Sequence, residues 1–243
     1  NDLGVTGHSW EWQYAGAVTV KGGSTEIRLH DMTGFDGRCD AVLLTRGGAP
    51  EPADVQKLRS IKCESIDKNY DLVVAGGGIA GMCAAAAAAR NGLKVALVND
   101  RPVLGGNNSS EIRVHLGGYV EMEPYKGLGR MIREFGHTEK GNARPAESYQ
   151  DWKKQAFIDA EENIDLYAPY HVMAVDTEDS EIESVTAVHI ETGEKVCLHG
   201  RLFADCTGDG TVGFLAGADW TMGRESRDEY GERSAPVKAD DMV

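Results

Sequence analysis

In the middle of the chain, apolar positions change from a continuous run to a helical stretch and back to a run. Residues 71–75 predict a buried strand, residues 79–91 a helix that Gly92 ends, and residues 93–98 a second strand. Continuous apolar runs are typical of parallel strands that are covered on both faces. The pattern therefore predicts a βαβ unit in an α/β fold.

The second half of the chain predicts one helix followed by a group of short strands. Residues 148–163 place their apolar side chains on one helical face. Residues 192–194 predict a hairpin turn, and residues 202–206 predict a further buried strand. The short strands between the helix and this last strand span residues 166–167, 171–175, 185–190 and 196–198. We therefore expect a β-meander beside the parallel sheet.

Residues 10–46 alternate apolar and polar side chains over short stretches that glycine-rich turns separate. This pattern is typical of an antiparallel β-sandwich. Three or four strands are too few to close a sandwich, so we expect a partial one without its partner strands. Gly and Pro residues at 47–52 predict the boundary between a domain at 1–62 and a domain at 63–243.

Composition and charge exclude several classes of protein. The 243 residues are 41% hydrophobic and 26% charged, which is typical of a folded chain and not of a disordered one. A net charge of −14 repels phosphate backbones, so we expect no nucleic-acid partner. The five cysteines form no CxxC pair, and we predict no metal site.

An uncharged stretch at residues 72–89 resembles a membrane span only in length. Three consecutive glycines and six consecutive alanines make it too weakly apolar to insert, so we predict no span. The chain opens on polar residues without a visible secretion signal, which leaves the compartment open.

A glycine motif lies between the first predicted strand and its helix. Gly76, Gly78 and Gly81 fit the pattern GxGxxG inside a βαβ unit of about thirty residues. The first glycine allows a tight turn, the second lets backbone approach a pyrophosphate, and the third lets the helix pack on the strand. The partial positive charge of the helix N-terminus favours the phosphates. This context predicts a dinucleotide site, whereas a second match at 208–213 lacks a following strand.

Dinucleotide-binding folds usually place a carboxylate near the ribose hydroxyls, at the end of the second strand. Asn99 occupies that position in this chain, and Asp100 follows it. The amide of Asn99 can bond a ribose hydroxyl, though more weakly than a carboxylate. The alternative is that Asn99 caps the turn before Pro102.

Three stretches together resemble the FAD-dependent oxidoreductases with a glutathione-reductase-like fold. They are the strand and glycine motif at 70–81, the Leu-Gly-Gly segment at 101–110, and the Asp-Cys-Thr-Gly-Asp-Gly segment within 202–210. The resemblance covers roughly residues 67–235. It implies an α/β, Rossmann-type FAD-binding domain with a β-meander, preceded by the partial antiparallel β-sandwich. Asn99 and Cys206 depart from the family's usual Glu and Ala.

The resemblance also implies which parts of the chain bind FAD. The pyrophosphate would rest on the glycine motif, the ribose near residues 99–101 and the flavin near residues 105–110. The adenine would lie by the Val172 backbone, and the phosphates and ribityl chain by residues 207–209. The cofactor-binding residues that we expect are Gly76, Gly78, Ile79, Ala80, Gly81, Asn99, Asp100, Arg101, Leu104, Gly105, Gly106, Asn107, Asn108, Ser109, Ser110, Val172, Thr207, Gly208 and Asp209.

Candidates for catalysis directly follow the flavin-proximal stretch. Alternation predicts a strand that places Glu111, Arg113 and His115 on one face. His115 suits proton transfer because histidine titrates near neutral pH. Arg113 suits an anionic substrate or the N1–C2 region of the flavin. The alternatives are a surface strand with paired charges, and a covalent flavin link through His115.

Residues 10–46 resemble the C-terminal half of golvesin- and xanthan-lyase-type carbohydrate-binding modules. The resemblance rests on Trp10, Trp12 and the Asp-Ala-Val-Leu-Leu stretch at 40–44. It implies that sugars stack on the two tryptophans, while the alternative places both rings in a sandwich core. A sugar-binding module would favour an extracytoplasmic location over a cytoplasmic one.

These features together predict an FAD-dependent enzyme that oxidises a small organic substrate by hydride transfer to flavin. A carbohydrate derivative is the candidate substrate. The alternatives are an NAD(P)-dependent dehydrogenase and a non-catalytic carbohydrate-binding protein with a degenerate flavin domain. The resemblance implies a substrate domain after about Gly223, yet only twenty residues follow. We therefore expect this chain to join the rest of a longer protein or a homo-oligomer, and to hold flavin weakly by itself.

Overall fold

The computed structural model describes residues 13–28, 42–46, 65–118, 121–136 and 140–241. The chain divides into two units, Asn1–Ser60 and Ile61–Val243, and each is described by itself.

The described part of the first unit contains no helix and no strand. Six of its large apolar side chains are half or more exposed, namely those of Tyr14, Val18, Val20, Ile27, Val42 and Leu44. An apolar strand face is stable only when a second layer covers it, and these segments have no such cover within the described residues. The predicted partial sandwich is therefore not confirmed. Trp10 and Trp12 lie outside the described residues.

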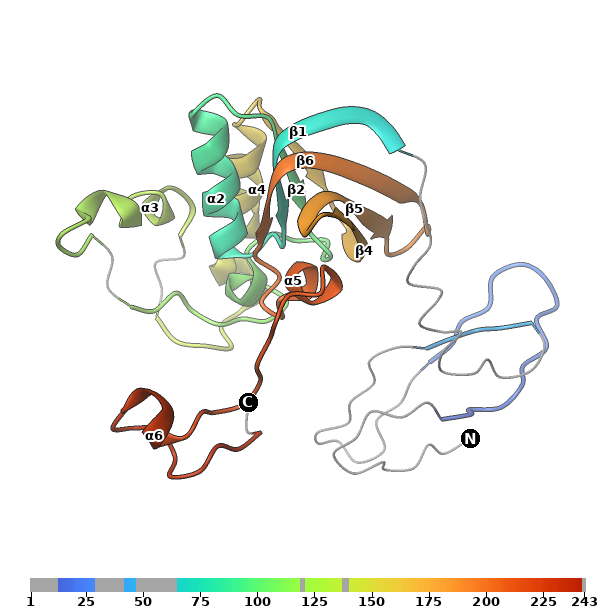
Figure 1. Cartoon of the computed structure of the whole chain (residues 1–243). Helices are drawn as coiled ribbons and strands as arrows, with labels where there is room; N and C mark the ends of the chain where they lie inside the picture. The colour runs from blue at the N-terminus through green and yellow to red at the C-terminus, as the bar shows by residue number, and fades with distance from the viewer. Residues whose placement is uncertain (1–12, 29–41, 47–64, 119–120, 137–139, 242–243) are drawn as a thin grey trace. The chain divides into compact units, whose positions relative to one another are not determined.

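The second unit is built on one six-stranded sheet (Figure 1). Its strands are β1 (Ser65–Ala75), β2 (Val95–Val98), β3 (Ile164–Tyr167), β4 (Tyr170–Glu178), β5 (Glu181–His189) and β6 (Lys195–Asp205), in the order β3-β2-β1-β6-β5-β4. β1 pairs in parallel with β2 and β6, and β2 pairs in parallel with β3. β5 runs antiparallel to both β4 and β6. The predicted α/β fold, a parallel Rossmann-type sheet with a β-meander, is confirmed.

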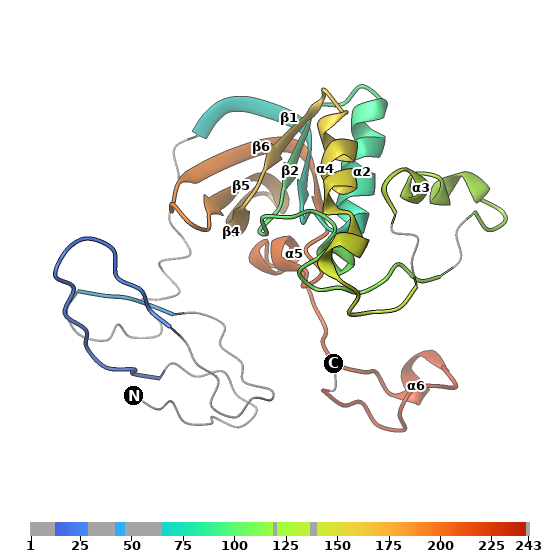
Figure 2. The same ribbon diagram turned by 180° about the vertical axis from the view of Figure 1, so that it is seen from behind.

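Layers on both faces explain the continuous apolar runs. The helices α2 (Ile79–Arg90) and α4 (Asp151–Asp159) lie on one face of the sheet, as Figure 2 shows from behind. Val74 of β1 packs in the buried cluster on that face, whereas its neighbours Val73 and Ala75 pack in the cluster on the other. The meander strands β4, β5 and β6 supply five of the eleven buried residues of the second cluster. The end of β1 at residues 72–75 and the whole of β2 are therefore apolar at every position.

Two predicted elements differ in detail. Residues 148–163 form no single helix: a short 3-10 helix at Ala146–Tyr149 ends at Gln150, whose φ of 50° is left-handed, and α4 follows. The sequence predicted two strands at residues 196–198 and 202–206, but the structure has one continuous strand there, β6 (Lys195–Asp205). Gly200 keeps this strand close to β1, because a Cβ there would lie 2.8 Å from the Val73 side chain. The predicted hairpin turn at Gly193, with φ 74°, is confirmed.

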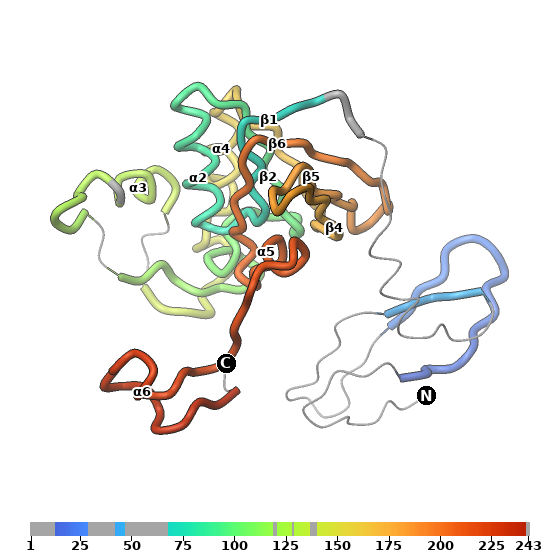
Figure 3. Tube along the Cα trace, in the orientation of Figure 1, coloured from blue at the N-terminus to red at the C-terminus, as the bar shows by residue number. Residues whose placement is uncertain are grey.

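Short helices complete the described part of the unit, and the tube in Figure 3 follows their order along the chain. They are η1 (Gly106–Asn108), η2 (Lys126–Gly129), α3 (Ile132–Phe135), η3 (Ala146–Tyr149), α5 (Thr211–Leu215) and α6 (Arg227–Tyr230). Within the described ranges, no helix is both long enough and apolar enough to cross a membrane. The same ranges contain no group of three or more potential metal ligands.

Candidate functional site

Three loops meet where the parallel strands end. The loop after β1 begins at Gly76, whose N–H donates to the Val98 carbonyl at 2.8 Å. The loop after β6 begins at Cys206, whose N–H donates to the Ala75 carbonyl at 2.7 Å. The loop after β2 returns at Gly105, whose N–H donates to the Gly77 carbonyl at 2.8 Å. The carboxyl edge of a parallel sheet is where α/β folds bind ligands, so we call this junction the three-loop edge.

Two glycines of the motif are required by the packing of the protein itself. Gly76 has a φ of 104°, and a Cβ on it would lie 2.2 Å from the Cys206 carbonyl oxygen. A Cβ on Gly81 would lie 1.9 Å from the carbonyl oxygen of Gly76. Gly76 therefore allows the tight turn, and Gly81 lets α2 lie directly against it, as the sequence predicted.

Gly78 differs, because nothing in the protein requires a glycine there. Its φ of −69° suits any residue, and a Cβ would meet no atom closer than the Gly106 Cα at 4.0 Å. The space beside Gly78 lies at the N-terminus of α2, where the N–H groups of Ile79 and Ala80 have no intrahelical acceptor. The first turn of α2 contains no acidic side chain. This glycine-lined space with free N–H donors fits a pyrophosphate.

The second loop meets the first through glycines. Gly105 and Gly106 have φ of 109° and 56°, and a Cβ on Gly106 would lie 3.1 Å from the Gly78 Cα. Leu104, immediately before them, is buried. The two loops thus present bare backbone side by side, which lets an extended cofactor run from one to the other.

The side chain of Asn99 forms its hydrogen bonds within the protein itself. The side chain is 3% exposed, and its Oδ1 accepts a hydrogen bond from the Gly77 N–H at 3.2 Å. Its Nδ2 donates to the carbonyls of Arg101 at 2.7 Å and Val103 at 3.1 Å. Both amide hydrogens are therefore in use. This geometry favours the alternative in which Asn99 orders the turn and does not grip the ribose.

The neighbouring residues are more open. Asp100 is exposed, and its Oδ2 lies 3.6 Å from the Nδ1 of His171. That contact lowers the pKa of the Asp100 carboxyl below its usual value. The Asn99 carbonyl accepts the Tyr170 N–H at 2.8 Å, which brings the start of β4 and the buried Val172 toward this corner. The exposed Arg101 guanidinium lies 3.5 Å from Glu111.

The third loop is organised by Asp205, which the sequence analysis did not single out. Its carboxylate accepts the Thr207 hydroxyl at 2.7 Å, and the N–H groups of Val212 and Gly213 at 2.8 and 3.0 Å. Burial opposes ionisation, but these hydrogen bonds outweigh it and lower the pKa of Asp205. The predicted residues Gly208 and Asp209 follow it and are exposed. Asp205 ends β6, and Gly210 is the N-cap of the next helix, α5, so the usual sequence signal of a helix start does not identify Asp205.

The segment 105–115 is held by residues 142–154, which we call the brace. The Ser110 N–H donates to the Asp151 carboxylate at 3.1 Å. Lys154 is fully buried, and its Nζ donates to the Tyr149 carbonyl at 2.6 Å. The methylene groups of Lys154 fill the space below Gly105, where a Cβ would lie 2.6 Å from them. The brace runs antiparallel to the segment. The start of the segment, at Gly105, therefore contacts the end of the brace, at Lys154, and the end of the segment, at His115, contacts the start of the brace, at Asn142.

The predicted strand at residues 111–115 is wrong. Residues 110–112 form a turn, and Arg113 has a left-handed φ of 63°. The Arg113 carbonyl accepts hydrogen bonds from the Tyr149 hydroxyl and from the Ala143 N–H, and its Nε donates back to the Ser110 carbonyl at 2.8 Å. Alternation failed here because long-range hydrogen bonds from the brace fix the backbone. Glu111, Arg113 and His115 therefore do not share a strand face.

The remaining predicted residues of the segment support its shape. Asn108 is buried and its Nδ2 donates to the Val114 carbonyl at 2.9 Å. The Ser109 hydroxyl accepts the Glu111 N–H at 3.3 Å. Asn107 is exposed, and its carbonyl accepts the Val114 N–H at 2.9 Å. Within this loop, Gly105 is buried against the Lys154 side chain, whereas Gly106 is partly exposed.

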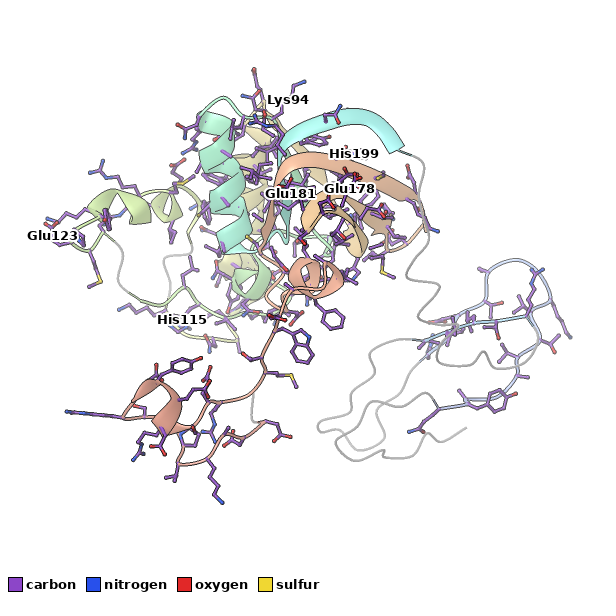
Figure 4. The ribbon with its side chains drawn as sticks, in the orientation of Figure 1. Lys94, His115, Glu123, Glu178, Glu181 and His199 are labelled. Carbon is purple, nitrogen blue, oxygen red and sulfur yellow. The ribbon has the colours of Figure 1, made fainter. Side chains whose placement is uncertain are left out.

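His115, which is labelled in Figure 4, is half-buried. Its backbone N–H and its ring Nδ1 both lie within hydrogen-bond distance of Asn142 Oδ1. No sequence signal identified Asn142, Tyr149, Asp151 or Lys154, because their contacts with the segment 105–115 join positions 27 to 49 residues apart and follow no local pattern.

One comparison with known proteins identifies the family of the chain. A protein-family model described as FAD dependent oxidoreductase matches residues 71–243, which is most of the chain. No curated protein sequence matches the chain.

Solved structures share parts of the fold at low identity. AlpK is 20% identical, with a TM-score of 0.46 over 67% of this chain and 36% of its own. OxyS anhydrotetracycline hydroxylase from Streptomyces rimosus is 18% identical, with a TM-score of 0.44 over 66% and 36%. The myxobacterial chondrochloren halogenase CndH is 17% identical, with a TM-score of 0.42 over 58% and 37%. The chain thus spans little more than a third of the length of these structures.

Proposed function

Because the chain belongs to the FAD-dependent oxidoreductase family, we propose that its three-loop edge binds FAD and serves the oxidation of a small organic substrate. The observation that carries this proposal is the contact between two bare glycine loops at Gly78 and Gly106. The packing of the protein does not require glycine at position 78. A ligand that approaches the Gly78 backbone closely would require it, because a side chain would occupy the ligand's space. The N-terminus of α2 offers its N–H groups to the same space.

Each loop takes a different part of the cofactor in this proposal. Gly76 to Gly81 hold the pyrophosphate, and residues 105–110 lie along the flavin ring. Asp100 is better placed than Asn99 to bond the adenosine ribose, because its carboxylate is exposed while the Asn99 amide is occupied. Thr207, Gly208 and Asp209 lie beside the phosphates and the ribityl chain.

Bound FAD supplies an acceptor for a hydride. The chain must then supply a group for the proton that the substrate loses with that hydride. His115 is the candidate acceptor, because it follows the flavin-proximal loop directly. Arg113 is the weaker candidate, since its guanidinium folds back onto the Ser110 carbonyl. An anionic substrate would have to draw it away.

The candidate carbohydrate substrate rests on the resemblance around Trp10 and Trp12 and stays a prediction. The family match leaves little support for an NAD(P)-dependent dehydrogenase without flavin. A degenerate, non-catalytic flavin domain is also disfavoured, because the glycines that FAD needs are all present.

A pair of glycine substitutions tests the proposed cofactor site. Gly78→Val places its branches in the proposed pyrophosphate space, whereas Gly127→Val places them in open space away from the three-loop edge. We expect Gly78→Val to weaken FAD binding by at least about tenfold, or 1.4 kcal/mol, with little change in the thermal midpoint of the FAD-free protein. Gly127→Val should bind FAD as the unaltered chain does. Equal FAD affinity in both variants would contradict the proposal.

A further inference from the structure

His115 and Asn142 form a pair whose geometry fixes where the hydrogen of the imidazole ring lies. One side-chain atom of Asn142 lies 3.0 Å from the His115 backbone nitrogen and 2.7 Å from its Nδ1. A backbone N–H can only donate, so the Asn142 atom that receives it is the amide oxygen. The usual uncertainty over the orientation of an asparagine amide is thereby removed.

The same oxygen decides the tautomer of the ring. An amide oxygen can only accept, so the Nδ1 of His115 must carry the hydrogen that it donates. In the neutral ring, Nε2 then holds the lone pair. A hypothetical Cβ on Gly117 would lie 3.9 Å from Nε2, so the glycine leaves this edge of the ring uncovered.

We propose that Asn142 is a positioning residue that holds His115 in the Nδ1–H tautomer, so that Nε2 accepts the substrate proton. The inference rests on the proposed function. The balance is simple: the substrate loses a hydride with its electron pair to the flavin, and a proton from its O–H or N–H to Nε2. His115 becomes an imidazolium, and solvent removes the extra proton afterwards.

The brace explains why this pair is held in place. Ala143, next to Asn142, donates its N–H to the Arg113 carbonyl at 2.8 Å, two residues before His115. The Tyr149 hydroxyl donates to the same carbonyl. Asn142 and His115 are therefore tied together at the backbone on one side and through the amide oxygen on the other. An ordered acceptor of this kind selects one ring nitrogen for proton transfer.

The experiment is a long-range ¹H–¹⁵N NMR correlation on the chain labelled at its histidine rings, recorded at about pH 9, where histidine is neutral. His115→Gln assigns the signals by their loss. We expect the Nδ1 of His115 to be the protonated, pyrrole-like nitrogen and Nε2 the pyridine-like one. Free histidine favours the opposite tautomer, so the Nε2–H pattern at His115 would overturn the proposal.

Three variants distinguish a specific effect of Asn142 on the His115 tautomer from a non-specific loss of structure. Asn142→Leu keeps the size of the side chain but removes the acceptor, and it should move His115 toward the Nε2–H tautomer. Asn142→Asp keeps an acceptor oxygen and should restore the Nδ1–H pattern. Gln155→Leu removes an amide that bonds Asp159 and should leave His115 unchanged. A tautomer that survives in Asn142→Leu would refute the positioning role even if that variant is less stable.

Addition of FAD tests the link to the flavin site. If Nε2 faces the cofactor, bound FAD should shift the Nε2 signal more than the Nδ1 signal. Saturation with FAD that leaves both ring nitrogens of His115 unmoved would overturn its role as proton acceptor. A chain that binds no FAD would instead defeat the proposed function, while the tautomer pattern would still decide the role of Asn142.

Discussion

The side-chain oxygen of Asn99 accepts a hydrogen bond from the Gly77 backbone N–H, so the end of β2 holds the glycine loop that follows β1. The same amide donates hydrogen bonds to the carbonyls of Arg101 and Val103 in the turn that leads to the segment 105–115. Asn99 therefore sets the relative position of two of the loops at the three-loop edge from inside the protein.

Asn99→Glu should destabilise the chain, although the sequence alone suggested that a carboxylate would restore ribose binding. Glutamate has no N–H to donate, so the Arg101 and Val103 carbonyls would face a buried anion. Loss of two buried hydrogen bonds should lower the free energy of unfolding by at least about 2 kcal/mol. Urea denaturation of the FAD-free protein measures this. Unchanged stability with tighter FAD binding would restore the ribose role of this position.

Lys154→Met should weaken the brace below Gly105. The substitution removes the buried hydrogen bond that the Lys154 ammonium donates to the Tyr149 carbonyl, at a cost of about 1–3 kcal/mol in unfolding free energy. Lys153→Met is the matched control, because the neighbouring ammonium lies over the exposed Trp152 ring. It should change stability by less than about 0.5 kcal/mol. Equal melting temperatures for the two variants would mean that the buried ammonium does not support the loop.

Gly81→Ala and Gly78→Ala should separate folding from binding within one motif. A methyl group on Gly81 collides with the Gly76 carbonyl oxygen, so α2 must move away from β1 at a cost of about 1–3 kcal/mol. A methyl group on Gly78 meets open space, and its effect should be confined to FAD affinity. Thermal unfolding without cofactor should therefore rank Gly81→Ala below Gly78→Ala. The reverse order would refute the assignment of roles within the motif.

Acid should loosen the third loop through Asp205. The pKa of this carboxyl is lower in the folded chain than in the unfolded one, because the loop N–H groups and the Thr207 hydroxyl bond the anion. Its stabilisation is present above the ordinary aspartate pKa of about 4 and is lost as pH falls through the lowered folded value. Asp205→Asn should therefore be less stable than the unaltered chain at neutral pH, with the difference shrinking toward pH 3. A stability difference that is independent of pH would contradict this account.

The parallel sheet could be predicted because its cause is local in the sequence. Val73, Val74 and Ala75 are apolar in succession, and layers on both faces require that pattern. Gly92, with φ 86° after α2, also followed from a simple end signal. The GxGxxG spacing correctly predicted the steric roles of Gly76 and Gly81, because a Cβ at either position would collide with backbone atoms of the same unit.

The site beyond the glycines depends on contacts between distant parts of the chain. Arg113 adopts a left-handed backbone because Ala143 and Tyr149 donate hydrogen bonds to its carbonyl. The alternation of apolar and polar residues at 111–115 does not predict these two long-range hydrogen bonds. Asn99 occupies a position that family patterns assign to the ribose, yet Gly77 lies within its reach and uses it. Period-two patterns and motif spacing describe neighbours along the chain, so they miss the brace.

The central claim is that the three-loop edge binds FAD, and a direct titration tests it. FAD and NAD⁺ are each added to the purified chain, and binding is followed by flavin fluorescence and by calorimetry. We predict saturable binding of one FAD per chain, even if weak, with no competition from NAD⁺ and a marked loss in Gly78→Val. A folded chain that binds NAD⁺ but shows no saturable binding of FAD would contradict the account.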